Sequence, residues 1–519
     1  MEVVIEMDVG PDLCSRCSGL PRRSTVSHSL LSRFALALLL GTSLATIAQG
    51  QGSPLVPAGK NSSSATTPFT SSRKLRFKST DYPTGTNPQT IVVGDFNKDG
   101  KLDFAQVNYN GGGAGSVSVF LGNGDGTFQA KKDYATGSGP DALAVGDVNG
   151  DGNLDLIVGN DTGATVSVLL GNGDGTFQAQ KQYAVGSFPH WVALADFNGD
   201  KKLDIAVTNE GNKTVGVLLN NGDGTFGQMH TFPTGSEPIS VAAADFNRDG
   251  NIDLVVTGYY DSIVSILLGN GDGTFQNHVD YATGTAPAVV LAADFNGDGN
   301  VDLATANYNN GQSGSVSILL GKGDGTFQKH VEYQAGTGPD GLAIGDFNGD
   351  GVADLAVANL IGDSMSILPG NGDGSFGTHV DFTTGTYPIG VAVGQFTGNG
   401  PSSQDLVITN DFSTTATVFL NEAAVRMTLK SSQNPSTKGQ PVTFTATVHA
   451  AVRQKSQPGG TVTFYDGSKK LGKVKLTNGV AELTTSKLSV GKHKIAAAYS
   501  GDNKFNPDQS PLLVQKVNP

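Results

Sequence analysis

Oxygen-bearing side chains recur at fixed spacing in a nine-residue segment, first seen as DFNKDGKLD from Asp95 to Asp103. Each intact copy has aspartate at positions 1, 5 and 9 and asparagine at position 3, and most copies have glycine at position 6. Ca²⁺ is a hard cation that takes about 6–8 oxygen ligands, and these side chains converge on one ion if the backbone turns tightly around it. We therefore predict about six calcium sites, with the side-chain ligands Asp95, Asn97, Asp99, Asp103; Asp147, Asn149, Asp151, Asp155; Asp196, Asn198, Asp200, Asp204; Asp245, Asn247, Asp249, Asp253; Asp294, Asn296, Asp298, Asp302; and Asp346, Asn348, Asp350, Asp354.

Two copies of this loop depart from the pattern. In the third copy Lys201 replaces the glycine at position 6, which is expected to strain the turn or weaken ion binding. The seventh copy, QFTGNGPSSQD from Gln395 to Asp405, has lost most of the acidic positions, and we expect no ion there. One alternative stays open for every copy, namely that the side chains only cap their own backbone as turns.

The loops belong to a repeat of about 50 residues, which is a length typical of one propeller blade. A proline stands seven residues before each loop, from Pro88 to Pro388, and the motif LGNGDGTF follows the first six loops with small changes. Short segments rich in Val, Ile, Leu and Tyr lie between these motifs, and NGDG is a strong hairpin signal. Each repeat is thus expected to form four strands, with the turn aspartate acting as a turn residue rather than an ion ligand.

This organisation predicts an all-β fold, a seven-bladed β-propeller of four-stranded blades. The last repeat stops one strand short, whereas the segment LRFKSTDYPTG from Leu75 is similar to a fourth strand. We therefore expect the N-terminal segment to complete the seventh blade and to remove the two free sheet edges. An open solenoid is the alternative.

On these motifs, about residues 76–425 resemble the FG-GAP/VCBS repeats of bacterial secreted proteins and the calcium-binding repeats of the integrin α-chain propeller. The resemblance implies a propeller domain over residues 75–425 with Ca²⁺ in the acidic loops. A fungal seven-bladed lectin family shares this architecture.

Residues 426–519 carry a different pattern, with alternating segments such as VTFTATV, GTVTFYDG and HKIAAAYSG. Strands at this spacing predict a β-sandwich. The stretch from TVTFYDG to SGDNKF closely resembles bacterial Ig-like domain repeats of surface proteins. The fold prediction is therefore a propeller followed by an Ig-like β-sandwich.

The end of each repeat unit opposite the acidic loops varies in sequence, which is how a rigid scaffold displays a binding surface on its loops. Six repeats have an asparagine five residues after the last loop aspartate, first Asn108, and we interpret it as a strand end with positive φ. The residues around it and after the prolines form a candidate ligand face on which sugar rings could stack: Tyr109, His190, Trp191, Tyr259, Tyr260 and Tyr308.

The N-terminus predicts export. The apolar run FALALLLGTSLATIA from Phe34 follows Arg33 and Arg22–Arg23, so residues 1–48 are interpreted as a secretory signal peptide. A membrane anchor is the alternative, but the run is shorter than a membrane span requires. Residues 49–74, rich in Ser, Thr, Pro and Gly, are expected to be a disordered linker. The mature chain is thus predicted to be secreted or at the cell surface, with no transmembrane segment.

Composition limits the function. The net charge of −13, from 34 basic and 47 acidic residues, argues against a nucleic-acid binder. Arg248 is the only arginine between Ser79 and Val425, so the arginine cluster of a sialidase is absent, as are nucleophile-elbow and phosphate-loop motifs. We expect a calcium-binding, non-catalytic binding or adhesion protein whose partner is an extracellular protein or glycan. The alternatives are a glycan-binding lectin and a polysaccharide-acting hydrolase or lyase.

Overall fold

The computed structural model describes residues 75–397, 404–422, 425–450, 457–502 and 504–519. The predicted signal peptide and linker therefore lie outside the described residues. Among these described residues, seven four-stranded antiparallel sheets lie between positions 77 and 421, and two further sheets follow. We number the seven sheets as blades 1–7 by the order of their first strands.

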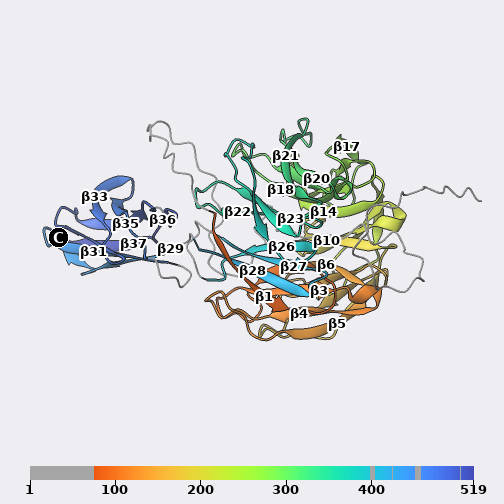
Figure 1. Ribbon diagram of the computed structural model, residues 1–519, viewed down its shortest axis with the longest axis horizontal. Helices are drawn as coiled ribbons and strands as arrows, with labels where there is room; N and C mark the ends of the chain where they lie inside the picture. The colour runs from red at the N-terminus through yellow and green to blue at the C-terminus, as the bar shows by residue number, and fades with distance from the viewer. Residues whose placement is uncertain (1–74, 398–403, 423–424, 451–456, 503) are drawn as a thin grey trace, which may run out of the picture. The chain divides into compact units, whose positions relative to one another are not determined.

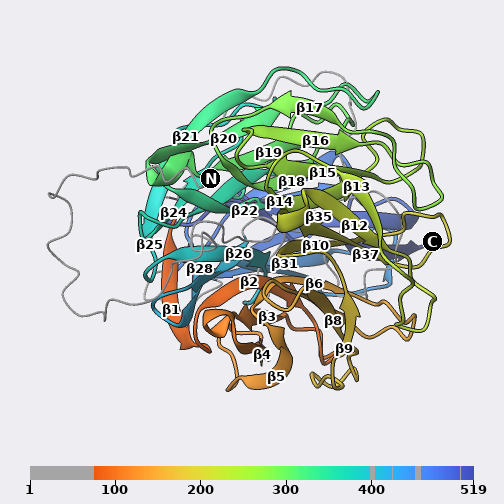
Figure 2. The same cartoon turned by 90° about the vertical axis from the view of Figure 1, so that its right-hand side faces the viewer.

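The first strand of every blade begins at a proline, as the repeat pattern predicted. These strands are β2 (Pro88–Gly94), β6 (Pro140–Gly146), β10 (Pro189–Ala195), β14 (Pro238–Ala244), β18 (Pro287–Ala293), β22 (Pro339–Gly345) and β26 (Pro388–Gly394). They contact one another from blade to blade, and contacts between β2 and β26 close the ring. Figure 2 shows them toward the middle of the ring, and their sheet-edge position explains why proline is tolerated.

The second strand of every blade begins at the last aspartate of the acidic loop. These strands are β3 (Asp103–Asn108), β7 (Asp155–Asn160), β11 (Asp204–Asn209), β15 (Asp253–Gly258), β19 (Asp302–Asn307), β23 (Asp354–Asn359) and β27 (Asp405–Asn410). All of their residues are buried, because both sheet faces pack against neighbouring blades.

The third and fourth strands form the outer half of each blade. The third strands are β4 (Ala114–Phe120), β8 (Thr165–Leu169), β12 (Thr214–Leu218), β16 (Ile263–Leu267), β20 (Ser313–Leu319), β24 (Ser364–Leu368) and β28 (Thr415–Asn421). The fourth strands are β5 (Lys132–Ser138), β9 (Lys181–Ala184), β13 (His230–Pro233), β17 (Val279–Ala282), β21 (Val331–Thr337), β25 (Val380–Thr383) and, in blade 7, β1 (Phe77–Pro83). The fourth strands are largely exposed, and charged side chains protect this outer edge. Short 3-10 turns η2 (Asn110–Gly112), η3 (Glu210–Asn212) and η4 (Asn309–Gly311) lie between the second and third strands of blades 1, 3 and 5.

The N-terminal strand completes the seventh blade, which confirms the predicted closure. β1 pairs with β28 from Phe77 opposite Asn421 to Pro83 opposite Thr415 (Figure 1). The Phe77 ring lies 5.1 Å from the Phe382 ring of blade 6. The propeller is therefore a ring of seven blades whose first and last strands in the sequence share one sheet.

Aromatic rings pack each blade against the next. The Phe96 ring, in the acidic loop of blade 1, lies 5.6 Å from Phe177, which ends the NGDG turn of blade 2. Tyr134 on β5 lies 5.4 Å from the same ring. Blades 3, 4 and 5 repeat this arrangement with their neighbours. Such pairs each add about 0.5–1.5 kcal/mol beyond area burial, so the repeated phenylalanines fix the angle between blades.

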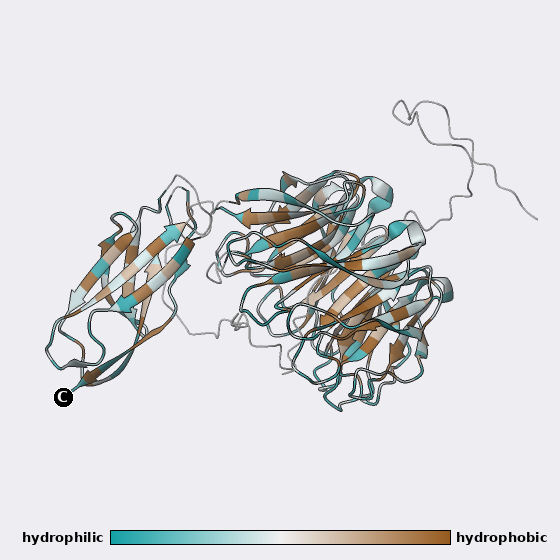
Figure 3. Cartoon of the chain, turned by 90° about the horizontal axis from the view of Figure 1, so that it is seen from below, coloured by the Kyte–Doolittle hydropathy of each residue, from teal (hydrophilic) through white to brown (hydrophobic). Residues whose placement is uncertain are grey.

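The C-terminal residues form the predicted β-sandwich. One sheet contains β29 (Val425–Ser431), β31 (Val442–Ala450) and β34 (Val480–Thr485). The other contains β30 (Ser436–Thr437), β37 (Leu513–Asn518), β35 (Gly491–Tyr499), β32 (Thr461–Asp466), β33 (Lys469–Lys475) and β36 (Asp508–Gln509). Apolar residues alternate along these strands (Figure 3). Phe444 from one sheet and Phe464 from the other are fully buried in a shared core. β29 begins at Val425, the residue that the sequence placed last in the propeller.

Candidate functional site

The acidic loops and the NGDG turns lie on one face of the propeller, and in blades 1, 3 and 4 the turn of the next blade holds the loop. The Gly175 amide of blade 2 donates a hydrogen bond to the Phe96 carbonyl in the loop of blade 1, at 3.0 Å. The same bond joins Gly273 to Phe197 and Gly325 to Phe246. The loops are thus fixed both by their own strands and by a neighbouring blade.

In the first loop, side-chain oxygens of positions 1, 3 and 5 turn inward toward the loop backbone. The Asp95 carboxylate accepts hydrogen bonds from the Asp99 and Gly100 amides at 3.1 and 2.8 Å. Asn97 Oδ1 accepts from the Asp99 amide, and Asp99 Oδ1 accepts from the Lys101 amide, both at 3.0 Å. These bonds wrap the chain into the tight turn that the spacing predicted.

The aspartate at position 9 is buried and joins the loop to the NGDG turn. Asp103 accepts hydrogen bonds from the Phe96 amide at 2.9 Å and from the Gly122 amide at 2.7 Å. Burial raises the pKa of Asp103 to about 7, and the nearby carboxylates of Asp95 and Asp99 raise it further against those two hydrogen bonds. The pKa of the equivalent aspartate is raised to about 6 or 7, again by burial first, in the other five loops: Asp155, Asp204, Asp253, Asp302 and Asp354. Negative charges are therefore close enough to repel one another in all six loops.

Two of the six loops differ in detail. Lys201 adopts a φ of 68° where other copies have glycine, and its amide still donates to Asp196, so the third loop keeps its shape at the cost of strain. In the sixth loop Asn348 Nδ2 donates to Asp354 at 3.2 Å, whereas the loop asparagines of the first three copies accept from the amide two residues on. Residues 398–403, in the degenerate seventh loop, lie outside the described residues.

The turn aspartates act as turn residues. Asp125 Oδ1 accepts hydrogen bonds from the Thr127 hydroxyl at 2.6 Å and the Thr127 amide at 3.0 Å. These bonds lower the pKa of the exposed Asp125 carboxyl. The same pair recurs at Asp174 with Thr176 and in the later repeats. The hairpin explanation therefore accounts for them.

The donor set of the acidic loops fits a hard cation. Each loop supplies three carboxylates. All loops except the sixth also supply an amide oxygen that is already turned toward the backbone. An oxygen that accepts one N–H keeps a second lone pair, which remains available to a metal ion. Across the described residues, three or more His, Cys, Asp or Glu side chains are nowhere gathered as closely as a metal ion requires. Ca²⁺ would thus draw the position-9 aspartate and the inner carboxylates together, and once bound would neutralise their repulsion.

At the opposite end of the blades, ionisable side chains meet near the ring axis. We call Asp141, Asp161, His190, Glu210 and Glu237 the axial cluster. Asp141 and His190 are the second residues of β6 and β10, Glu237 precedes β14, and Asp161 and Glu210 follow β7 and β11. In every blade, the start of the first strand and the last residue of the second strand lie on the side opposite the acidic loop. Blades 2, 3 and 4 therefore bring the five residues together.

His190 is the centre of the axial cluster. Its Nδ1 lies 3.0 Å from Asp141 Oδ2, and its Nε2 contacts Glu210 Oε2 and lies 4.0 Å from Asp161 Oδ1. Burial alone would lower the pKa of His190, but the Asp141 and Glu210 carboxylates outweigh it and raise the pKa to about 10. His190 is therefore an imidazolium with both N–H groups donating to carboxylates.

The remaining acids carry excess negative charge. Burial raises the pKa of Asp161 to about 6, against the opposing effects of His190 and of the Tyr109 hydroxyl, which donates to Asp161 at 3.2 Å. Burial and the Glu210 carboxylate raise the pKa of Glu237 to about 7. Four carboxyl groups thus surround a single cation.

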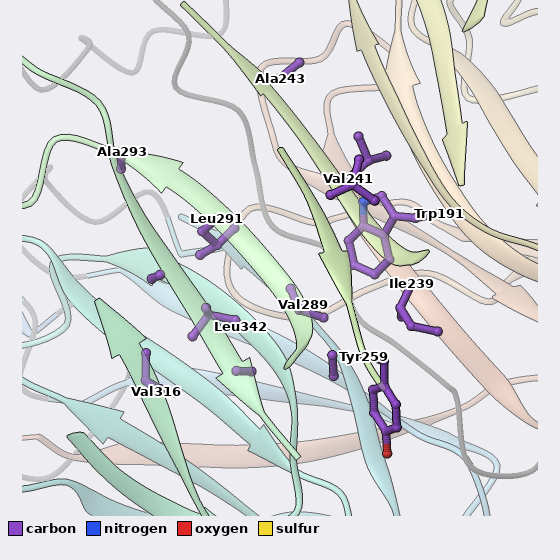
Figure 4. Packing of buried hydrophobic residues seen from close by; sticks show 14 of the residues in the cluster. Trp191, Ile239, Val241, Ala243, Tyr259, Val289, Leu291, Ala293, Val316 and Leu342 are labelled. Atoms are coloured by element: carbon purple, nitrogen blue, oxygen red, sulfur yellow. The ribbon is translucent and has the colours of Figure 1, made fainter. Parts of the chain in front are cut away.

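The structure brings the predicted ligand-face residues to this end of the propeller, but most of them are not a stacking surface. Tyr109, His190, Trp191, Tyr259 and Tyr308 are all buried. Figure 4 shows Trp191 with Ile239 and Val241 in the apolar core, and the Tyr259 and Tyr308 rings lie 6.3 Å apart. The first strands converge here, so large side chains fill the space between blades. Of the six predicted residues, only Tyr260 is exposed, at 67 %.

The strand-ending asparagines do not have positive φ, which corrects the sequence interpretation. Asn209 has a φ of −121°, and Asn108 is not among the residues with positive φ. Instead, Asn108 Oδ1 accepts from the Gly85 amide at 2.8 Å, and its Nδ2 donates to the Ser116 and Ser118 hydroxyls. This asparagine ties the end of the second strand to the third strand, β4, and to the connection that precedes the first strand, β2.

Sequence reasoning selected His190 as a site residue but none of the four acidic residues of the axial cluster, among them Glu237. The sequence position of Glu237 could have identified it, because Glu237 precedes Pro238 and His190 follows Pro189, the equivalent proline of the neighbouring repeat.

These features define a closed-ring propeller with acidic inter-strand loops, joined in sequence to a β-sandwich. The FG-GAP-like repeat family matches residues 107–158, 147–207, 196–256, 247–305 and 294–357, and the bacterial Ig-like domain (group 3) matches residues 429–518. The chain is an FG-GAP-repeat β-propeller protein with a C-terminal bacterial Ig-like domain.

Comparison with curated proteins gives no match. Among solved structures, a virginiamycin B lyase from Staphylococcus aureus is 13 % identical with a TM-score of 0.45, covering 66 % of this chain and 99 % of its own. The periplasmic gluconolactonase of Pseudomonas aeruginosa is 17 % identical with a TM-score of 0.42, covering 57 % and 85 %. The V. cholerae biofilm matrix protein Bap1 is 15 % identical with a TM-score of 0.31, covering 84 % and 68 %. At these values none of the three informs the function of this chain. Within the described part of the chain, helices long and apolar enough to cross a membrane are absent.

Proposed function

We propose that this chain is a secreted, non-catalytic binding or adhesion protein whose propeller is stabilised by Ca²⁺ in its acidic loops. The observation that carries the proposal is the set of six loops, each with a buried aspartate whose pKa is raised partly by two neighbouring carboxylates. Repulsion repeated six times in one ring is a feature that a bound divalent cation would offset in each of the six blades concerned. In this role Ca²⁺ fixes one face of the propeller and leaves the opposite face for a ligand.

Isothermal titration of metal-free full-length protein with Ca²⁺ tests the proposal. We expect five or six bound ions, because the sixth loop differs in the position of Asn348. Asp151→Asn, in the second loop, should remove one ion, whereas the matched control Asp174→Asn, in the nearby turn, should remove none. Absence of Ca²⁺ binding, or equal loss in both variants, would refute the proposal.

A glycan as the ligand is the more specific form of this proposal. Exposed rings lie in the loops away from the acidic-loop face, with Phe188, Tyr260 and Phe412 at 44, 67 and 54 % exposure. Exposed aromatic rings of this kind can stack on sugar rings. A glycan array probed with Ca²⁺-loaded protein tests it, and a Tyr260→Ala variant should reduce any signal. Product release from polysaccharide would instead favour the hydrolase or lyase alternative.

A further inference from the structure

The axial cluster holds buried oxygen atoms that lack hydrogen-bond donors. Asp141 Oδ1, Asp161 Oδ1 and Glu237 Oε2 accept no hydrogen bond from any described residue, and the three residues are 2, 2 and 7 % exposed. A buried acceptor left without a donor costs about 1–3 kcal/mol, and more when it is charged. The His190 imidazolium already donates both of its N–H groups, to Asp141 and Glu210, so it cannot serve these atoms.

The balance of charges in the cluster also favours a cationic ligand. His190 faces Asp141, Asp161 and Glu210, and Glu237 faces Glu210 as well as His190. One imidazolium therefore stands against four carboxyl groups. A ligand that carries a positive charge and several hydrogen-bond donors would reduce the repulsion between the carboxylates. It would also donate hydrogen bonds to the buried oxygens that accept none.

One side of the cluster reaches the protein surface through Glu210. The Glu210 side chain is 26 % exposed and reaches from the exterior to His190. The Tyr260 hydroxyl hydrogen-bonds to Glu237, and its ring is 67 % exposed. Phe188, 44 % exposed, lies beside the turn that carries Glu210, whose amide donates to the Phe188 carbonyl at 3.1 Å. The partly exposed Glu210 carboxylate and two exposed aromatic rings thus lie at this side of the cluster, with Glu237 buried behind Tyr260.

We propose that the axial cluster is a binding site for a primary ammonium group, which would enter beside Glu210 and Glu237 with its carbon stem against Tyr260. An ammonium group has three N–H donors and no acceptor, so it can donate to the buried carboxylate oxygens of the cluster that accept no hydrogen bond. Aromatic faces also attract cations. A neutral hydroxyl could donate a hydrogen bond but would leave the carboxylate repulsion in place. The inference rests on the binding role proposed above and gives that role a ligand chemistry, independent of Ca²⁺.

Two sources share this chemistry, an amino sugar and an alkylamine such as a lysine side chain. Full-length protein saturated with Ca²⁺ is titrated calorimetrically with glucosamine, with cadaverine, and with N-acetylglucosamine as the matched neutral form. We expect binding of at least one amine and no binding of N-acetylglucosamine. Binding of glucosamine alone identifies an amino-sugar site, and binding of cadaverine alone identifies an alkylamine site.

Variants locate the site. Glu237→Gln and Glu210→Gln should each weaken amine binding at least tenfold, whereas Glu332→Gln, on the outer strand β21, should leave it unchanged. Calcium stoichiometry should be the same in all three, so failure of one proposal leaves the other intact. If Glu237→Gln does not fold, Tyr260→Ala, at an exposed position, should weaken binding severalfold. Equal binding of glucosamine and N-acetylglucosamine, no binding of either amine, or unchanged affinity in Tyr260→Ala would overturn the inference.

Discussion

Without calcium, we expect the propeller to become less stable as the pH rises from 5 to 7.5, the reverse of ordinary acid denaturation. The position-9 aspartates have a pKa of about 6 or 7 in the folded protein, for example Asp155 and Asp103, against an ordinary value of 3.8. A carboxyl whose pKa is raised by folding holds its proton longer in the folded state. Its stabilisation is therefore full below the unfolded pKa and is lost as the pH rises through the folded pKa.

The size of the effect follows from these values. One pKa unit corresponds to about 1.4 kcal/mol, so each such aspartate should cost about 1.5–2.5 kcal/mol more at pH 7.5 than at pH 5. Six of them together approach the whole free energy of unfolding of a typical domain, about 5–15 kcal/mol. Carboxyls with a lowered pKa, such as Asp125, titrate below this range and do not oppose the trend. The metal-free protein should thus lose at least several kcal/mol of stability, and bound Ca²⁺ should restore it at pH 7.5.

Urea unfolding of protein stripped of metal on a chelating resin, followed by circular dichroism at pH 5 and 7.5, measures this difference. The same pair of curves with saturating Ca²⁺ should show the higher stability at pH 7.5, because Ca²⁺ competes with protons for the same oxygens. Asp103→Asn should reduce the difference in unfolding free energy between pH 5 and pH 7.5 of the metal-free protein by the contribution of one aspartate. If metal-free protein is more stable at pH 7.5 than at pH 5, the reasoning about the loops is wrong.

Three further outcomes follow from the fold. His190→Gln removes the only cation from the axial cluster and should destabilise the protein by about 3–5 kcal/mol at pH 7. The loss of stability should be smaller at pH 5, where Asp161 and Glu237 become protonated. An equal loss at both pH values in thermal melts would contradict this. Asn108→Ala leaves the Gly85 amide without its acceptor and should lower the free energy of unfolding in urea by about 1–3 kcal/mol. Removal of residues 75–83 leaves β28 as an open edge, so light scattering should detect oligomers; a monomer with an unchanged melt would argue against closure by β1.

The repeats were readable in sequence because each motif has a local cause. Proline marks the start of the first strand, the position-9 aspartate starts the second, and the NGDG aspartate caps its own turn. These assignments depend on backbone chemistry within a few residues, so they transfer from copy to copy. The closing strand was also predictable, since its pattern is that of a fourth strand.

Features that arise between blades were not predictable in this way. The burial of Tyr259 and Trp191 depends on how closely the first strands converge, which no single repeat encodes. The pairing of His190 with Asp141 joins residues 49 positions apart in neighbouring blades. Asn108 was misinterpreted because its partners are close in space rather than in sequence: Gly85 lies in the connection between β1 and β2, and Ser118 lies on β4.

The pairing of β1 with β28 also determines how the ring responds to mechanical force. The strands are antiparallel, and Phe77 and Asn421 lie opposite each other at the end where the chain leaves the propeller on both sides. Tension applied through the two flanking segments therefore meets the pair at one end and separates its hydrogen bonds one after another, rather than shearing all of them at once. The other six blades carry none of that force until β1 has peeled away. Stretching would thus open the ring at its seventh blade at low force, and relaxation would let the same strand re-anneal.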